Sequence, residues 1–215
     1  MKIKKTILFA FLAAYATFSY AVLIHKAVKN LDLEKLKKIV RRANVNEIGG
    51  IWRETPLHIA AQKAGHANKE GGTPDYTKRK KAFEIIKLLV SKGANVNKKT
   101  KTDKKTTLLL VYPKDPGATE KEKNMRFSVV KYLINQGTDV NAKSLLGTDM
   151  LTRAIRNYDP EMAKLLLTNG ALVKDKHTKL AQRLGKRLVR KIENRRAKKQ
   201  KFETWQKKST KIANI

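Results

Sequence analysis

A short motif recurs along this chain and divides it into repeating units. Three copies, residues 43–46, 94–97 and 138–141, read Ala-Asn-Val-Asn, Ala-Asn-Val-Asn and Thr-Asp-Val-Asn, and residues 170–173 form a more divergent fourth. Apolar residues with i, i+3, i+4 spacing precede each copy and predict an amphipathic helix. These segments are Leu36–Val40, Ile85–Val90, Val129–Ile134 and Met162–Leu167. A chain of such units must stack them to bury a continuous core.

The first helix of each unit is less regular than the second. The second unit opens with Thr55-Pro56-Leu57-His58-Ile59-Ala60-Ala61. The corresponding segments elsewhere are Leu23–Val28, Thr106–Val111 and Gly147–Ala154. In the last of these, Asp149 stands where the second unit has Thr55, and its carboxylate can still cap a helix. Pro160 precedes the last apolar segment, at a position that a helix start tolerates.

The Thr-Pro-Leu-His-x-Ala-Ala segment, followed by Gly65-His66 and closed by Gly93-Ala94-Asn95-Val96-Asn97, resembles an ankyrin repeat. The resemblance covers roughly residues 22–192. It implies an all-α solenoid of stacked helix–turn–helix units with projecting turn tips, which we call fingers. It also implies a non-catalytic protein that binds a protein partner through the fingers and the concave face of the first helices. The resemblance further implies that His25 and His58 bond the backbone of the neighbouring turn.

Insertions lengthen two of the units. Asn46, Asn97 and Asn141 are 51 and 44 residues apart, whereas the family period is about 33. Clusters of Gly, Pro and Asp, which favour turns, place the extra residues near Ala67–Lys80 and Tyr112–Asn124. Both insertions would lie between a first and a second helix, and therefore on one face of the solenoid.

The N-terminus has the three-part layout of a secretory signal peptide of bacterial type. A basic head with Lys2, Lys4 and Lys5 precedes an apolar run, and Ser19-Tyr20-Ala21 is a small-x-small ending. We therefore expect cleavage after Ala21 and a secreted or periplasmic protein. The alternative is an uncleaved membrane anchor over residues 6–24, close to the ~20 residues that a spanning helix needs.

These patterns predict the following organisation: a signal peptide (1–21), an N-terminal capping repeat (22–46), two repeats with insertions (47–97 and 98–141), a further repeat (142–173), a degenerate C-terminal capping repeat (174–192) and a basic tail (193–215).

The chain is strongly basic, with 49 Lys and Arg against 18 Asp and Glu and a net charge of +31. Such an excess attracts acidic proteins, anionic lipid or nucleic acid, although a Lys-rich composition alone can also produce it. Leu180, Leu184, Leu188 and Ile192 form one helical face, which predicts a capping helix or, alternatively, a free basic amphipathic helix. The candidate polyanion-binding residues are Arg187, Arg190, Lys191, Arg195, Arg196, Lys198, Lys199 and Lys201.

The resemblance places the candidate partner-binding residues on three fingers, near residues 49–54, 98–105 and 142–147. Trp52 is the preferred anchor, because a Trp at a turn tip offers a large apolar area, although it could equally pack on the adjacent tip. The other candidates are Arg53, Glu54, Lys99, Lys101, Lys104, Lys105, Leu145 and Leu146. The lysines would contact an acidic surface or remain solvated.

The sequence carries no pattern of catalytic chemistry. It has no Cys, hence no disulfide and no zinc–thiolate site, and it has no HExxH, Walker or GxGxxG motif. Repeat register accounts for His25, His58 and His66 as structural residues. We expect no enzyme activity, no cofactor, no bound metal and a monomeric state.

Overall fold

The computed structural model describes residues 21–40, 45–49, 53–66, 75–115 and 118–184. Within these ranges the secondary structure is helical, and the strand-like contacts are two isolated antiparallel bridges, Gly49–Glu54 and Lys99–Thr106. The chain forms two compact units, residues 1–172 and 173–215, which we describe separately. The signal-peptide and anchor predictions fall almost entirely on residues 1–20, outside the described residues.

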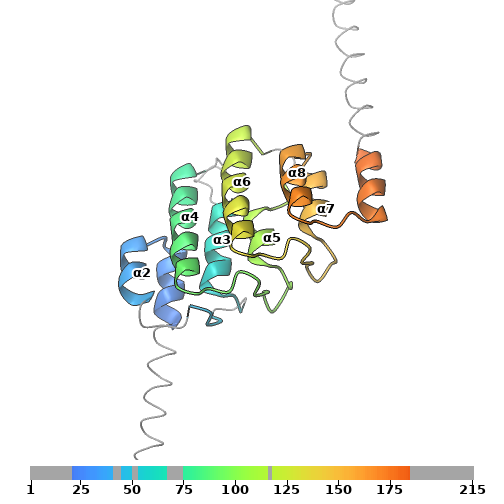
Figure 1. Ribbon diagram of the computed structural model, residues 1–215. Helices are drawn as coiled ribbons and strands as arrows, with labels where there is room; N and C mark the ends of the chain where they lie inside the picture. The colour runs from blue at the N-terminus through green and yellow to red at the C-terminus, as the bar shows by residue number, and fades with distance from the viewer. Residues whose placement is uncertain (1–20, 41–44, 50–52, 67–74, 116–117, 185–215) are drawn as a thin grey trace, which may run out of the picture. The chain divides into compact units, whose positions relative to one another are not determined.

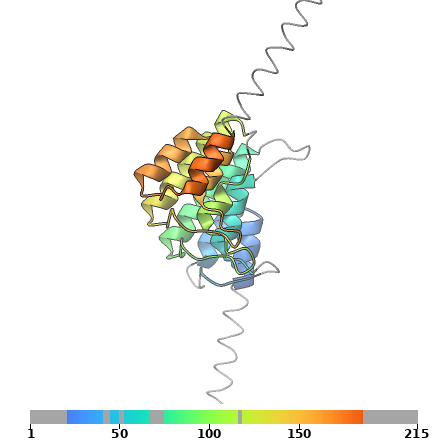
Figure 2. The same ribbon diagram turned by 90° about the vertical axis from the view of Figure 1, so that its right-hand side faces the viewer.

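Helices in the first unit come in pairs. The pairs are residues 21–29 with α2 (Leu33–Ile39), α3 (Pro56–His66) with α4 (Tyr76–Ser91), α5 (Thr107–Val111) with α6 (Glu120–Asn135), and α7 (Met150–Arg156) with α8 (Pro160–Thr168). Figure 1 shows the pairs side by side along the unit, and Figure 2 shows them one behind another. We call residues 21–29, α3, α5 and α7 the inner helices and α2, α4, α6 and α8 the outer helices. The predicted all-helical stacked fold is confirmed.

Side-chain caps fix where the outer helices begin. The carboxylates of Asp32, Asp75 and Asp159 accept from the amide three residues on, at 2.9 to 3.0 Å. Thr119 forms a capping box, in which its hydroxyl accepts from the Glu122 amide and Glu122 accepts from the Thr119 amide. Each cap satisfies an amide that the first helical turn leaves without a partner.

The predicted cap at Asp149 is confirmed, because its carboxylate accepts from the Thr152 amide at 2.8 Å. Pro160 also lies in the first turn of α8, where its missing N–H costs nothing.

The apolar core runs between the two layers of helices. Leu57, Ala60 and Ala61 of α3 are buried between neighbours, and Ile85 and Leu89 of α4 are fully buried beneath them. The small alanines of the inner helix let adjacent pairs approach closely, while the larger outer-helix residues fill the space between layers. Gly65 marks the closest approach, since a Cβ there would lie 2.7 Å from the backbone oxygens of Leu110 and Val111.

The recurring Asn residues connect successive units. The side-chain amide of Asn46 donates to the carbonyl oxygen of Gly93, and its Oδ1 accepts from the Asn95 amide. Asn141 repeats the arrangement with Gly170 and Leu172. Gly93, Gly137 and Gly170 have φ near +80°, a left-handed conformation in which Gly pays no Cβ penalty and which ends α4, α6 and α8.

Part of each predicted insertion is helical rather than loop. Residues 76–80 and 120–124 are helical and form the first turns of α4 and α6, because the Asp75 and Thr119 caps start these helices early. The added turns carry a buried ionic cluster. Arg79 donates to Glu122 at 3.0 Å and to the Gly65 carbonyl at 3.0 Å, and Arg126 donates to Gly65 and Asp115.

In the second unit, residues 175–184 form a helix. The Lys174 amide donates to Nδ1 of His177 at 3.1 Å. Leu180 and Leu184 are half-buried, whereas Leu188 and Ile192 of the expected stripe lie outside the described residues. The roles expected for residues 174–192 and 193–215 remain predictions.

Candidate interaction surface

Each finger is a tight turn held by its own backbone. Gly49 and Glu54 exchange two backbone hydrogen bonds, of 2.9 and 3.2 Å. In the second finger the Thr100 amide donates to the Lys105 carbonyl at 2.9 Å, and in the third the Ser144 amide donates to that of Thr148 at 2.9 Å. The second and third fingers, whose residues are all described, are therefore formed before any partner arrives.

The second and third fingers are also bonded to each other. The Leu145 amide donates to the carbonyl oxygen of Asp103 at 2.8 Å. Side chains on the two fingers consequently keep a fixed spacing, and they can act as one surface rather than as separate loops.

Histidines connect the inner helices to the fingers that follow, as the resemblance implied. Nε2 of His58 lies 2.7 Å from the Lys98 carbonyl oxygen, and Nδ1 accepts from the Thr55 amide at 3.1 Å. Because Nδ1 accepts, Nε2 carries the proton and donates. Nε2 of His25 lies 2.9 Å from the Glu54 carbonyl oxygen. Among the described residues no His, Cys, Asp or Glu cluster could hold a metal ion.

The candidate residues of the first finger differ in character. Arg53 is exposed, whereas Glu54 is half-buried and accepts a hydrogen bond from Gln62. Burial raises the pKa of the Glu54 carboxyl despite that bond. Glu54 is therefore held partly inside the molecule and also supplies the carbonyl that His25 contacts. Trp52, the preferred anchor, lies outside the described residues.

The candidates on the other two fingers are mostly accessible. Lys99, Lys101 and Lys104 are exposed, while Lys105 is half-buried and paired with Asp103 at 2.6 Å. Leu145 and Leu146 are 67% and 90% exposed, so two large apolar side chains stand in solvent at the tip of the third finger. The structure thus brings the lysine candidates and the leucine candidates onto adjacent, bonded fingers.

Two fingers place a basic residue in a left-handed backbone conformation. Arg53 and Lys104 have φ of 50° and 52°, and Gly147 has φ of 68°. An inner helix begins directly after Thr55, Thr106 and Asp149. The left-handed residues lie two positions earlier: Arg53 before Thr55, Lys104 before Thr106 and Gly147 before Asp149. The three are therefore equivalent in the repeat. For residues with a Cβ this conformation costs roughly 1–2 kcal/mol.

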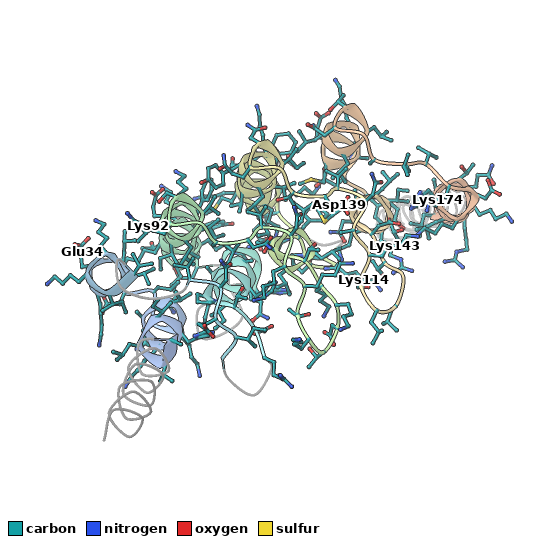
Figure 3. All side chains as sticks on the ribbon, turned by 60° about the horizontal axis from the view of Figure 1, so that its bottom comes forward. Glu34, Lys92, Lys114, Asp139, Lys143 and Lys174 are labelled. Atoms are coloured by element: carbon teal, nitrogen blue, oxygen red, sulfur yellow. The ribbon has the colours of Figure 1, made fainter. Side chains whose placement is uncertain are left out.

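The inner helices contribute a set of basic residues that the sequence analysis did not select. Lys26 and Lys29 are exposed, Lys63 and Arg156 are half-buried, and Lys114, just beyond α5, is exposed. Figure 3 shows Lys114 on the inner side of the unit, away from Glu34 and Lys92 of the outer side. The repeat pattern located the first helices, which carry most of these residues, but it did not show that the helices share one layer.

The polyanion-binding candidates, Arg187, Arg190, Lys191, Arg195, Arg196, Lys198, Lys199 and Lys201, all lie outside the described residues. Among the helices that the structure describes, none combines the length and the apolar character needed to cross a membrane.

Comparison with known families agrees with this architecture. Residues 52–101 match the family model for the ankyrin repeat; this range contains α3, α4 and the first half of the second finger. No curated protein matches the chain. Together with the helix pairs, the closing glycines and the fingers, the match identifies the fold as an ankyrin-repeat solenoid. Ankyrin repeats are in general non-catalytic modules that bind other proteins.

Proposed function

We propose that this chain is a non-catalytic scaffold or adaptor that binds one protein partner through its fingers and the adjoining face of its inner helices. The observation that supports this most strongly is the bond between the second and third fingers. A surface whose loops are already ordered loses little conformational entropy on binding, and the exposed Leu145 and Leu146 offer apolar area at its edge.

Affinity capture tests the proposal. The full chain is immobilised and exposed to nuclease-treated lysates, then washed at rising salt. We expect a discrete protein to remain at ~0.5 M salt, where exposed charges are screened within a few ångströms. Substitution of both Leu145 and Leu146 with Ser should release it. If nothing remains after moderate salt, or if retention requires nucleic acid, the scaffold function is wrong.

A polyanion-binding role for the C-terminal segment is the second candidate. Residues 174–215 hold 16 Lys and Arg against 3 Asp and Glu. Binding of this kind should weaken steeply with salt because counterion release drives it. Truncation after residue 184 should abolish it and leave the helix pairs folded; unfolding on truncation would favour the capping role instead.

We also propose export of the protein by its N-terminal segment, on the strength of the basic head, the apolar run and the Ser-Tyr-Ala ending. The intact mass of the protein recovered from producing cells tests this. Loss of residues 1–21 supports export, and an uncleaved chain in the membrane fraction supports the tether.

A further inference from the structure

The two layers of helices differ in the signs of their charges. The inner helices, residues 21–29, α3, α5 and α7, contain five Lys and Arg and no Asp or Glu. Every outer helix carries at least one Glu. On the outer side Glu34, Glu84 and Glu120 form i, i+3 ion pairs with Lys37, Lys87 and Lys123. The outer helices therefore carry charges of both signs, whereas the charged side chains of the inner helices are all Lys or Arg.

A Lys-rich composition does not explain this difference. Compositional bias adds lysines to every exposed position, but it does not remove acids from one layer and retain them in the other. The inner layer and the second finger together present Lys26, Lys29, Lys63, Lys114 and Lys104 to solvent. The acids beside them, Asp103 and Asp115, are paired with Lys105 and Arg126, so positive charge predominates on this surface. An excess of one sign attracts the opposite sign and speeds its association.

The left-handed residues of the fingers also favour a negatively charged ligand. Gly147 shows that the repeat accepts Gly at this position, yet Arg53 and Lys104 occupy it with a backbone that disfavours any side chain. Backbone strain of this kind persists where it serves a function. Leu31 and Tyr158 adopt the same conformation elsewhere in the fold, so the strain alone marks no site. On the fingers, however, the side chains retained at that cost are both cations.

The apolar neighbours distinguish between classes of anionic ligand. Ile59 and Ile155 are half-buried on the inner helices, and Leu145 and Leu146 are exposed on the third finger. The inner helices contain no Phe, Tyr or Trp, the residues that usually provide stacking platforms for bases. Cations mixed with aliphatic side chains suit a polypeptide that carries both carboxylates and apolar residues.

We propose that the inner helices and the second and third fingers bind an acidic polypeptide segment with interspersed aliphatic side chains. Lys63, Lys114 and Lys104 pair with its carboxylates, and Leu145 and Leu146 contact its apolar residues. This inference rests on the proposed scaffold function and specifies the chemistry of the partner.

The test compares two triple variants of the full chain that lose the same charge. The inner-face triple is K63A/K104G/K114A, in which Gly matches the backbone of residue 104. The outer-face triple is K81A/K131A/K164A, three exposed lysines of α4, α6 and α8. The probes are a peptide of repeated Glu-Glu-Leu units, a peptide of repeated Glu-Glu-Ser units and oligo-dT, each titrated at fixed salt, with thermal unfolding as the check of folding.

We expect the inner-face triple to lose about tenfold in affinity for the Glu-Glu-Leu peptide, since three exposed pairs contribute up to ~1 kcal/mol each. The outer-face triple should change it less than about twofold, and the Glu-Glu-Ser peptide should bind the parent chain more weakly. Equal losses in both triples would show that net charge alone governs binding, and no loss in either would place binding elsewhere; both overturn the site. Tighter binding of oligo-dT that depends on the inner face would make the ligand a nucleic acid.

Failure of this site and failure of the scaffold function are distinguishable. If the parent chain captures a protein at ~0.5 M salt but the two triples bind the Glu-Glu-Leu peptide equally well, the scaffold function stands and the acidic site is wrong. If the parent chain captures no protein under those conditions, the scaffold function itself is wrong.

Discussion

The side chain of Asn97 bonds to the carbonyl oxygen of Gly137, 40 residues further along the chain, at 2.9 Å. Its Oδ1 also accepts from the Asp139 amide at 2.8 Å. Asn46 and Asn141 make the corresponding pairs of bonds to the units that follow them. The residue that defines the repeat in the sequence is therefore the residue that connects the repeats in space.

Replacing Asn97 with Ala should lower the free energy of unfolding by about 1–2 kcal/mol, because two inter-unit hydrogen bonds worth roughly 0.5–1.5 kcal/mol each are lost. Urea unfolding followed by circular dichroism measures this. Asn95 is the matched control: its side chain accepts a local bond from the Asn97 amide, so Asn95→Ala should cost less. Equal losses would mean that the inter-unit bonds add nothing.

Acidification should destabilise the protein through His58. Burial lowers the pKa of this imidazole below its ordinary 6.5, so above about pH 6.5 both folded and unfolded states carry it neutral and the stability is fully present. Below that value the unfolded state binds the proton first. The free energy of unfolding then decreases as the pH drops toward the folded-state pKa, by at most ~1.4 kcal/mol per pH unit.

Urea midpoints at pH 7.5 and 5.5 test this effect, with His58→Gln as the comparison. Partial burial and the nearby Arg126 and Arg79 also lower the pKa of His66, which adds a loss of the same sign in both proteins. The pH-dependent loss should therefore be smaller in the Gln variant, though not absent. Identical losses would rule out His58 as a source.

Gly65→Ala should destabilise the stack by about 1–3 kcal/mol, since an overpacked interface must shift its backbone. The added methyl would lie 2.7 Å from two backbone oxygens of α5, which cannot rotate away as a side chain could. Thermal unfolding provides the measurement. An unchanged midpoint would show that α3 and α5 separate at little cost.

Lys104→Gly should stabilise the fold and weaken binding of an acidic peptide. Relief of the left-handed backbone is worth roughly 1–2 kcal/mol, offset by the ~0.5–1 kcal/mol of extra chain entropy that Gly loses, for a net gain of up to ~1.5 kcal/mol. Gly147→Lys is the converse variant and should destabilise. A destabilised Lys104→Gly would show that the lysine side chain supports the finger itself.

Periodicity predicted much of the fold because its causes are local. The closing Asn motif and the apolar spacing located the outer helices, and Asp149 was expected as a cap from its side chain alone. The helical state of residues 76–80 and 120–124 was not predicted, since the capping capacity of Asp75 and Thr119 was not used. The buried cluster of Arg79, Glu122 and Arg126 was missed because it joins residues 43 or more positions apart, and no pattern within one repeat records it.

The candidate site was only partly predictable for a related reason. Fingers could be located from the repeat boundaries, and the exposure of Leu145 and Leu146 followed from their place at a turn tip. The absence of acids from the inner helices becomes visible only when four separated segments are placed in one layer. Likewise, Arg53 and Lys104 share a left-handed backbone conformation that residues with a Cβ disfavour. Their residue types therefore gave no sign of it in the sequence.

The most direct measurement is lysine acetylation of the full chain with and without bound Glu-Glu-Leu peptide, read out by mass spectrometry. Our account predicts that Lys63, Lys104 and Lys114 are protected in the complex, while Lys81, Lys131 and Lys164 react equally in both states. Protection of the outer-helix lysines, or equal protection of both sets, would contradict the assignment of binding to the inner helices and fingers.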